Sequence, residues 1–173
     1  MNNISINALK NCLKKKLSDE LNSIEINCMK NLSHFIFYIW ANYMIDNIMN
    51  ILDGMRNWVE FKKLLSACDP IGYFPELNAI EIASNDIAIL YETVLIDTPL
   101  SKFFSTYLEN NTWDLKNFNE VQTFFKEEKP EKVWSSLKWV LMEDFYDFIR
   151  TMNSTTAESM EEILFMEADF KTL

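Results

Sequence analysis

The chain has 173 residues and a net charge of −10, with 49% apolar and 24% charged residues. An acidic surface repels phosphate backbones, which argues against general nucleic-acid binding. Only 2 Gly and 4 Pro are present, so the chain has few tight turns. This composition argues against β-sandwiches, β-barrels and glycine-rich nucleotide folds, and it favours helices joined by polar loops.

The charge is distributed unevenly along the chain. Residues 1–63 carry eight basic and six acidic side chains, whereas residues 64–173 carry eight basic and twenty acidic ones. Such asymmetry is typical of a face that meets a basic partner, and also of an acidic face exposed to solvent.

The first 31 residues predict a basic start followed by a helix. Residues 1–17 are polar and then basic, which predicts a frayed start or a loose first helix. Ser18 precedes Asp19 and Glu20, a pattern that places a capping hydroxyl and two carboxylates at the positive end of a helix. We therefore expect a helix from Ser18 to about residue 31.

Residues 34–52 form the most hydrophobic segment, about as long as the ~20 residues that a membrane span needs. Asn42, Asp46 and Asn50 lie four residues apart and form a polar stripe along one face. A buried Asp and several Asn are costly in lipid. The segment is therefore interpreted as a core helix of a soluble protein, which Asp53-Gly54 ends.

A short amphipathic helix is predicted over residues 56–66. Its apolar positions are Trp58, Val59, Phe61, Leu64 and Leu65. Residues 69–72 predict a turn, because Pro supplies a fixed φ and Gly the freedom to bend. A loop is expected from there to about residue 79.

The sharpest local signal is Asp97-Thr98-Pro99. A helix is predicted from the Asn85-Asp86 cap to about Ile96, and Pro99 cannot continue it. Pro99 fits the first turn of a second helix, with Thr98 as its cap. That second helix carries Leu100, Phe103, Phe104 and Tyr107.

The last third of the chain predicts three further helices. Residues 109–136 are less regular, with one short helix between the breaks at Asn110-Asn111 and Lys129-Pro130. Residues 137–152 form a strongly amphipathic helix. Residues 155–158 read Thr-Thr-Ala-Glu, a capping box that opens a last helix running to the end. The whole pattern predicts an all-α assembly of about seven helices, with a polar, basic extension at 1–17 and a single domain at 18–173.

Metal and thiol chemistry has little support. The single histidine is His34, and Cys12, Cys28 and Cys68 show no metal-ligand spacing. We interpret His34 as a capping or core histidine and Cys68 as a buried structural thiol. Reduced thiols and the lack of a visible secretory signal suit a reducing compartment. No metal and no other cofactor is predicted.

Carboxylate pairs are numerous but not specific. Glu143 with Asp147, and Glu158 with Glu162, share helix faces at i, i+4. An acid–base hydrolase using such a pair is one interpretation, and a solvated acidic face is the simpler one. A ferritin-like di-iron site needs repeated Glu-x-x-His, which one histidine cannot supply. The residues alone thus predict an acidic helical protein, without catalytic machinery, that acts through protein–protein contacts.

Five segments, in order, resemble subunit d of the vacuolar-type proton ATPases. Residues 43–48 resemble Tyr-Met-Ile-Asp-Asn-Val, and residues 68–74 are similar to a Cys-His-Pro-Leu-Gly turn, with Asp69 in place of the His. Residues 90–100 give the longest and most specific likeness. These three segments contain the family-motif residues Tyr43, Asp46, Asn47, Pro70, Gly72, Tyr91, Glu92, Asp97, Thr98 and Pro99.

The other two segments lie near the C-terminal end. Residues 142–148 resemble Leu-Glu-Asp-Phe-Tyr-Asn-Phe, and residues 163–169 resemble Leu-x-Phe-Glu-Ala-Asp. The two arginines that follow in the family are Phe170 and Lys171 here. These segments add the motif residues Glu143, Phe145, Tyr146, Glu167 and Asp169, for which the resemblance implies structural roles.

The resemblance implies a non-catalytic subunit of a rotary proton pump. In that family a helical funnel sits on the proteolipid c-ring and receives central stalk subunits D and F, so that torque reaches the ring and drives proton transport. It implies peripheral attachment, through protein partners and without a transmembrane helix, at the cytoplasmic face of vacuolar or endolysosomal membranes.

Departures from the family pattern leave an alternative open. Family chains are longer and build the funnel from three related helical units, so this chain is expected to form a partial version. Residues 109–136 have no clear counterpart. The alternative interpretation is a divergent or truncated relative that acts as a helical protein-binding module outside the pump.

Overall fold

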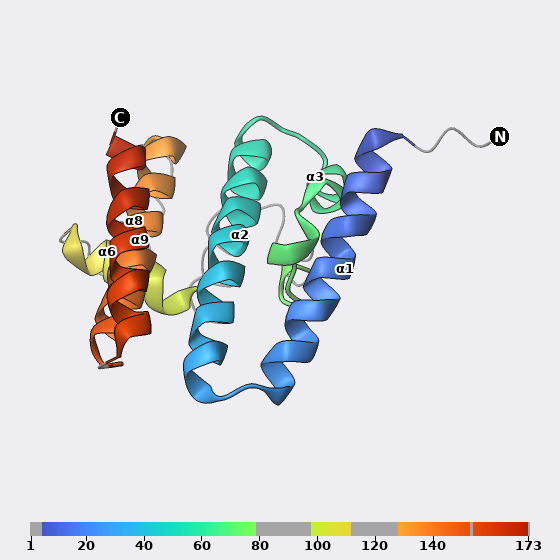
Figure 1. Ribbon diagram of the computed structural model, residues 1–173. Coiled ribbons are helices and arrows are strands. Elements are labelled where there is room, and N and C mark those ends of the chain that lie inside the picture. The colour runs from blue at the N-terminus through green and yellow to red at the C-terminus, as the bar shows by residue number, and fades with distance from the viewer. Residues whose placement is uncertain (1–4, 79–97, 112–127, 153, 173) are drawn as a thin grey trace.

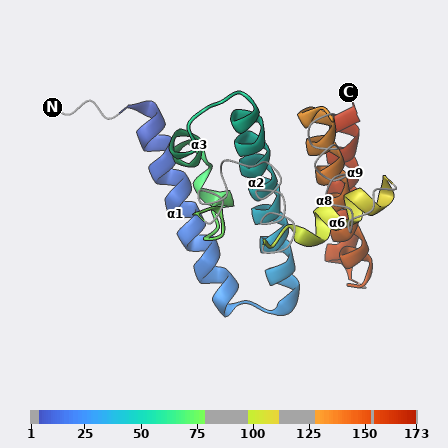
Figure 2. The ribbon, with the colours of Figure 1, turned by 180° about the vertical axis from the view of Figure 1, so that it is seen from behind.

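The computed structural model describes residues 5–78, 98–111, 128–152 and 154–172, with side chains up to residue 166. Six α-helices and one 3₁₀ helix occupy these ranges, without a strand, which confirms the all-α prediction. The predicted helices at 85–96 and within 112–127 lie outside the described residues. Figures 1 and 2 show α2 in the middle, with α1 on one side and α8 and α9 on the other.

Helix α1 spans Ile6–Asn27 and begins earlier than predicted. The Ser5 hydroxyl accepts a hydrogen bond from the Ala8 amide (3.1 Å) and caps the first turn. Ser18 therefore lies inside the helix, so the predicted start there and the end near residue 31 are wrong. The division of the chain at residue 17 stays a prediction, although α1 crosses it without a break.

Helix α2 spans Lys30–Arg56 and confirms the predicted core helix. It does not end at Asp53-Gly54. The Gly54 carbonyl accepts from the Val59 amide (2.9 Å) and the Met55 carbonyl from the Trp58 amide (3.1 Å), the pattern of a Schellman cap. Trp58 takes the left-handed position of that cap, with φ 59°.

The helix predicted over residues 56–66 begins later than expected, because the Schellman cap comes first. Helix α3 spans Phe61–Ala67, so Trp58 and Val59 precede it, and the Trp58 side chain is 95% exposed. The 3₁₀ helix η1 spans Pro70–Gly72, and the Asp69 carboxylate accepts from the Ile71 amide (3.1 Å). The predicted turn at 69–72 is confirmed.

Helix α6 spans Ser101–Asn110 and buries Phe103, Phe104 and Tyr107, as predicted. The buried Thr98 hydroxyl accepts from the Leu100 amide (3.3 Å) just before the helix. The cap position itself belongs to Leu100. Thr98 therefore stabilises the approach to α6 rather than capping its first turn, a correction to the sequence prediction.

The last two helices also begin at other residues than predicted. Helix α8 spans Pro130–Arg150, because Pro130 fits the first turn and starts the helix seven residues before Leu137. Helix α9 spans Thr155–Thr172, and its capping hydroxyl comes from Ser154, which accepts from the Ala157 amide (3.3 Å). The predicted capping box at Thr155 is therefore wrong: the cap lies one residue earlier, and Ala157 at the third helical position has no side chain to complete a box.

The hydrophobic core lies between α2, α6 and α8. Phe145 of α8 stacks on Tyr38 of α2, with ring centroids 4.3 Å apart, and Phe35 is the next ring at 6.0 Å. The largest side chains with almost no exposure are Ile36, Ile45, Ile48, Ile51, Leu77, Leu100, Phe103 and Phe104. None of the helices in the described ranges combines the length and apolar character that crossing a membrane requires.

Candidate functional site: the polar contacts of α2

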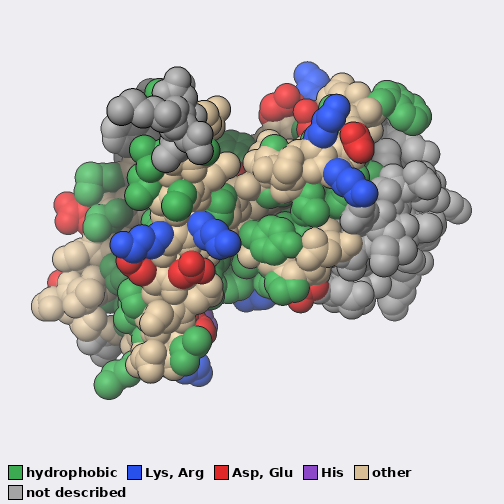
Figure 3. All heavy atoms as spheres, turned by 90° about the vertical axis from the view of Figure 1, so that its right-hand side faces the viewer, with side chains coloured by type: hydrophobic (Ala, Val, Ile, Leu, Met, Phe, Trp, Pro, Cys, Tyr) green, Lys and Arg blue, Asp and Glu red, His purple; other side chains and the backbone are tan. Residues whose placement is uncertain are grey.

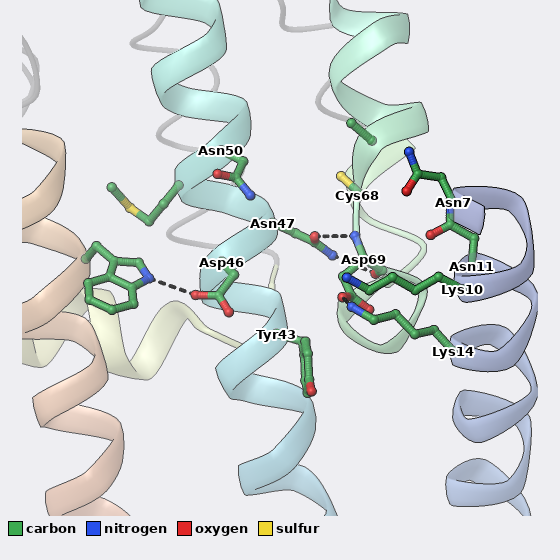
Figure 4. A pocket seen from close by; sticks show the side chains of 13 residues that line it. Asn7, Lys10, Asn11, Lys14, Tyr43, Asp46, Asn47, Asn50, Cys68 and Asp69 are labelled. Carbon is green, nitrogen blue, oxygen red and sulfur yellow. Dashed lines mark hydrogen bonds and ion pairs between the residues drawn. The ribbon is translucent and has the colours of Figure 1, made fainter. Parts of the chain in front are cut away.

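Asn47 fastens η1 to α2 (Figure 4). Its side chain is almost fully buried, at 1% exposure. The Asn47 Nδ2 donates to the Asp69 carbonyl (3.0 Å), and its Oδ1 accepts from the Asp69 amide (2.6 Å). One side-chain amide thus satisfies both backbone groups of a residue that precedes a turn, which buried backbone requires.

Gly72 allows η1 to lie directly on α2. A Cβ at Gly72 would overlap the backbone carbonyl of Tyr43 and the amide of Met44. Backbone atoms of a packed helix cannot move aside as a flexible side chain can. Glycine at this position is therefore required by close approach of the two backbones.

Lys14 connects α1 to the same junction. Its ammonium forms an ion pair with the Asp69 carboxylate and lies 5.7 Å from the centroid of the Tyr43 ring. The carboxylate also accepts from the Ile71 amide. Asp69 stands where the Cys-His-Pro-Leu-Gly turn of the family has its His. Its carboxylate thus caps η1 and holds α1 in place.

Asp46 points the other way, toward α8 (Figure 4). Its Oδ1 accepts from Trp134 Nε1 (2.7 Å) and pairs with Lys138 Nζ (2.9 Å). Lys138 is 7% exposed and also donates to the carbonyl and side-chain oxygens of Asn42. A buried ammonium needs such partners, because an unpaired charge in the interior is costly.

An open cavity of about 650 Å³ lies between these contacts. Its lining combines amides, two lysines and two aspartates, from α1, α2, the α3–η1 connection and α8. The residues that line it include Asn7, Lys10, Asn11, Lys14, Tyr43, Asp46, Asn47, Asn50, Cys68, Asp69 and Trp134. Both aspartates already have partners in the helix contacts described above.

Cys68 is not poised as a nucleophile. Burial, and then the neighbouring Asp69 carboxylate, raise the pKa of the Cys68 thiol to about 11. The thiol therefore stays protonated at neutral pH, and only the thiolate reacts readily. Its Sγ lies 3.5 Å from the Leu64 carbonyl, within reach of a weak hydrogen bond. The half-buried position and raised pKa support the structural interpretation.

His34 is neither a core residue nor a cap, contrary to the prediction. It is exposed in the second turn of α2, where its Nδ1 lies 3.1 Å from the Lys30 carbonyl. The ring stacks on Phe148 of α8, with centroids 4.3 Å apart and an interplanar angle of 10°. Flat packing across the α2–α8 contact explains an imidazole at this position.

Three carboxylates of α8 and α9 have structural partners. Glu143 accepts from Trp139 Nε1 (2.8 Å), and Asp144 forms an ion pair with Lys102 of α6. Glu161 accepts from the Tyr146 hydroxyl (2.8 Å), a hydrogen bond that raises the pKa of Tyr146. Within the described residues, no three or more His, Cys, Asp or Glu gather where they could hold a metal ion.

The structure groups one third of the predicted motif residues. Tyr43, Asp46, Asn47, Pro70 and Gly72 meet at the junction of α2 with η1 and α8. The other described positions lie elsewhere: Thr98 and Pro99 precede α6, while Glu143, Phe145 and Tyr146 belong to α8. Glu167 and Asp169 lie within α9, without described side chains, and Tyr91, Glu92 and Asp97 lie outside the described residues.

Sequence reasoning missed the two lysines of the junction. Lys138 stands in the apolar run Leu137-Lys138-Trp139-Val140. A lone lysine among core positions could have indicated a buried ion pair. Lys14 belongs to a basic cluster, and nothing in its neighbours distinguishes it from Lys15 or Lys16.

Comparison with known proteins shows the family of the chain. The family model described as ATP synthase (C/AC39) subunit matches residues 1–173. The chain belongs to this family. The "Probable V-type proton ATPase subunit d 2" of Drosophila melanogaster is 31% identical over 169 residues, which are 98% of this chain and 45% of that protein.

Similar matches to C/AC39 relatives come from plants and fungi. The "Probable V-type proton ATPase subunit d" of Oryza sativa subsp. japonica is 32% identical over 154 residues, 89% of this chain and 40% of that protein. The "V-type proton ATPase subunit d" of Saccharomyces cerevisiae is 30% identical over 159 residues, 91% of this chain and 43% of that protein. The chain spans less than half the length of these curated relatives.

Proposed function

We propose that this C/AC39 protein is a non-catalytic subunit of a V-type proton ATPase that couples the central rotor stalk to the proteolipid ring. The observation that carries the proposal is the family match over all 173 residues, joined to relatives named V-type proton ATPase subunit d. Coupling would support ATP-driven proton transport without chemistry on this chain.

The arrangement of α2 supports a mechanical role. A part that transmits torque must resist deformation, and α2 is attached on both sides by oriented polar contacts. Asn47 binds the backbone of Asp69 on one side, and Asp46 binds Lys138 on the other. Hydrogen bonds with fixed geometry hold the register of packed helices as well as their proximity.

The proposed partners are the proteolipid c-ring and central stalk subunits D and F. The excess of acidic side chains in residues 64–173 would suit a basic surface on the stalk. Attachment to the ring through protein contacts would place the chain peripherally, at the cytoplasmic face of vacuolar or endolysosomal membranes.

Native purification tests the proposal. The chain, tagged at its N-terminus, is purified from mildly solubilised membranes, and its partners are identified by mass spectrometry. We expect proteolipid and stalk subunits at matching stoichiometry. Recovery in a soluble fraction without pump subunits contradicts the proposal and favours a protein-binding module outside the pump.

A matched pair of variants sharpens this test. Asn47→Ala removes the hydrogen bonds that fasten η1, whereas Asn50→Ala changes an exposed asparagine one turn further along α2. We expect Asn47→Ala to lower recovery of pump subunits and Asn50→Ala to leave it unchanged. Equal recovery with both variants would show that the junction is not needed for assembly.

A further inference from the structure

Helix α1 packs on the rest of the chain with its polar side. None of its residues is buried. Lys14 reaches Asp69 and Tyr43, and the cavity beside it is lined by Asn7 and Asn11. A surface helix of a globular protein normally turns its apolar stripe toward the core. In this chain the apolar stripe of α1 is left without a partner within the described structure.

The apolar stripe of α1 is well defined. It consists of six aliphatic side chains, of which Leu21 is half-buried and the others are 46–84% exposed: Ile6, Leu9, Leu13, Leu17, Leu21 and Ile24. Their spacing averages 3.6 residues, the period of a straight α-helix. Figure 3 looks at the side of the molecule that carries α1 and shows hydrophobic side chains along it, between charged ones. Contiguous exposed apolar surface of this kind marks an interaction site.

We propose that the stripe pairs with α1 of a second copy, with the two helices antiparallel. The stripe is symmetric about Lys15, because its steps are three, four, four, four and three residues. An antiparallel copy centred on Lys15 therefore sets Ile6 opposite Ile24, Leu9 opposite Leu21 and Leu13 opposite Leu17. Each apolar side chain meets another one, and Lys15 itself is not part of the stripe.

The charges of α1 favour the same direction. Its four lysines lie at positions 10–16, whereas its three carboxylates lie at positions 19–25. Antiparallel pairing centred on Lys15 sets Lys10 of each helix opposite Glu20 of its partner, and it also opposes the two helix dipoles. Parallel pairing would place like charges side by side.

The result is a closed, two-fold dimer in which both copies use the same surface. Stable interfaces bury about 1,200–2,000 Å², and one helix pair lies at the low end of that range. We therefore expect a micromolar dissociation constant. The proposal is independent of the pump assignment, because it concerns the purified chain alone.

Analytical ultracentrifugation of the full chain at increasing micromolar concentrations tests the pairing. We expect wild type to shift from monomer to dimer, and Leu13→Glu to weaken dimerisation by at least about tenfold, because a buried Leu contributes about 1.5–3 kcal/mol. Asn22→Glu is the matched control: it adds the same charge at an exposed α1 position outside the stripe and should leave dimerisation unchanged.

Circular dichroism of each variant checks that helix content is kept, which the exposure of Leu13 predicts. A wild-type chain that stays monomeric at every concentration overturns the proposal. So does a dimer that persists in Leu13→Glu. If wild type is monomeric and Leu13→Glu instead abolishes recovery of pump subunits, the stripe belongs to another subunit and self-pairing is wrong.

Cross-linking tests the direction of the helices. Chains carrying Leu13→Cys and Leu17→Cys, each with Cys12→Ser, are mixed and oxidised. Antiparallel pairing predicts a disulfide between residue 13 of one copy and residue 17 of the other. Disulfides that form only between identical variants would mean a parallel pair and would overturn the antiparallel arrangement.

Discussion

Helix α2 is held differently on its two sides. Toward α8 it contributes to a core in which Phe145 stacks on Tyr38 and the Lys138 charge is buried with its partners. Toward α1 the contacts are polar: Ser33 of α2 donates to the Glu25 carboxylate (3.1 Å), and the Lys14 ammonium lies over the Tyr43 ring. Beside them lies the polar cavity, and α1 buries no residue. One side is stabilised by buried area, the other by a few oriented polar groups.

Two adjacent residues of α2 make polar contacts on its two sides. Asp46 and Asn47 are adjacent in sequence, so they point about 100° apart around α2. Asp46 reaches α8, and Asn47 reaches the residue before η1. A short polar pair in the middle of an apolar helix thus connects two separate layers.

The difference between the two sides of α2 is tested most strongly by truncating one large side chain in α8 and one in α1. Phe145→Ala should lower the free energy of unfolding by about 3–5 kcal/mol, because it leaves a cavity beside Tyr38. Leu13→Ala on α1 should change it by less than about 0.5 kcal/mol, because the side chain is exposed. Urea denaturation of the monomeric chain measures both, and similar losses would contradict the distinction.

Two glycines test the backbone contact between α2 and η1. Gly72→Ala should cost about 3 kcal/mol, because the new Cβ overlaps the Tyr43 backbone. Gly54→Ala meets only side-chain atoms of Leu64, which must turn aside, and this cost is offset by up to about 1 kcal/mol of helix propensity. Thermal unfolding should therefore separate the two variants clearly, and an unperturbed Gly72→Ala would mean that η1 is not seated on α2.

The buried Lys138 ammonium offers a test of the polar contacts between α2 and α8. Asp46→Ala removes the carboxylate partner of Lys138 and should lower the free energy of unfolding by about 2 kcal/mol. Asp144→Ala breaks an exposed ion pair with Lys102 and should cost less than about 0.5 kcal/mol. Denaturation of both proteins at the same salt concentration is the measurement; equal effects would contradict the buried role of Lys138.

The end of α2 offers a stabilising change. Trp58 holds a left-handed conformation that costs an L-residue roughly 1–2 kcal/mol and costs glycine little. Trp58→Gly should therefore raise the free energy of unfolding by about 1 kcal/mol. Asn57→Gly, at the cap residue with negative φ, should give no gain. A destabilised Trp58→Gly would show that the exposed indole contributes contacts of its own.

The smallest effect concerns reactivity rather than stability. The raised pKa of Cys68, about 11, means that its alkylation should stay slow at neutral pH and accelerate only as pH rises toward 11. In the urea-unfolded chain Cys68 should react like an ordinary thiol, with about a hundredfold more thiolate at neutral pH. Peptide mapping after labelling gives the rates, and fast labelling of the folded chain would contradict its burial.

Much of the helical framework was predictable from local chemistry. The apolar period of residues 34–52 and the Asp69–Gly72 turn both act through neighbouring residues, so they are readable from the sequence alone. The errors in the prediction lie at helix ends. The actual caps are Ser5, Ser154 and the Schellman motif at Trp58, and neighbouring residues carry capping patterns of the same kind. The motifs at Tyr43–Ile48 and Cys68–Phe74 correctly pointed to the family.

By itself the sequence determined an all-α, acidic chain, its central apolar helix and its membership of the C/AC39 family. Only the tertiary structure decided which partners the polar residues take. Lys138 finds Asn42 and Asp46 from the opposite helix, and Lys14 rather than Lys15 finds Asp69. These contacts join residues 55 to 96 positions apart, and no local propensity encodes such a distance.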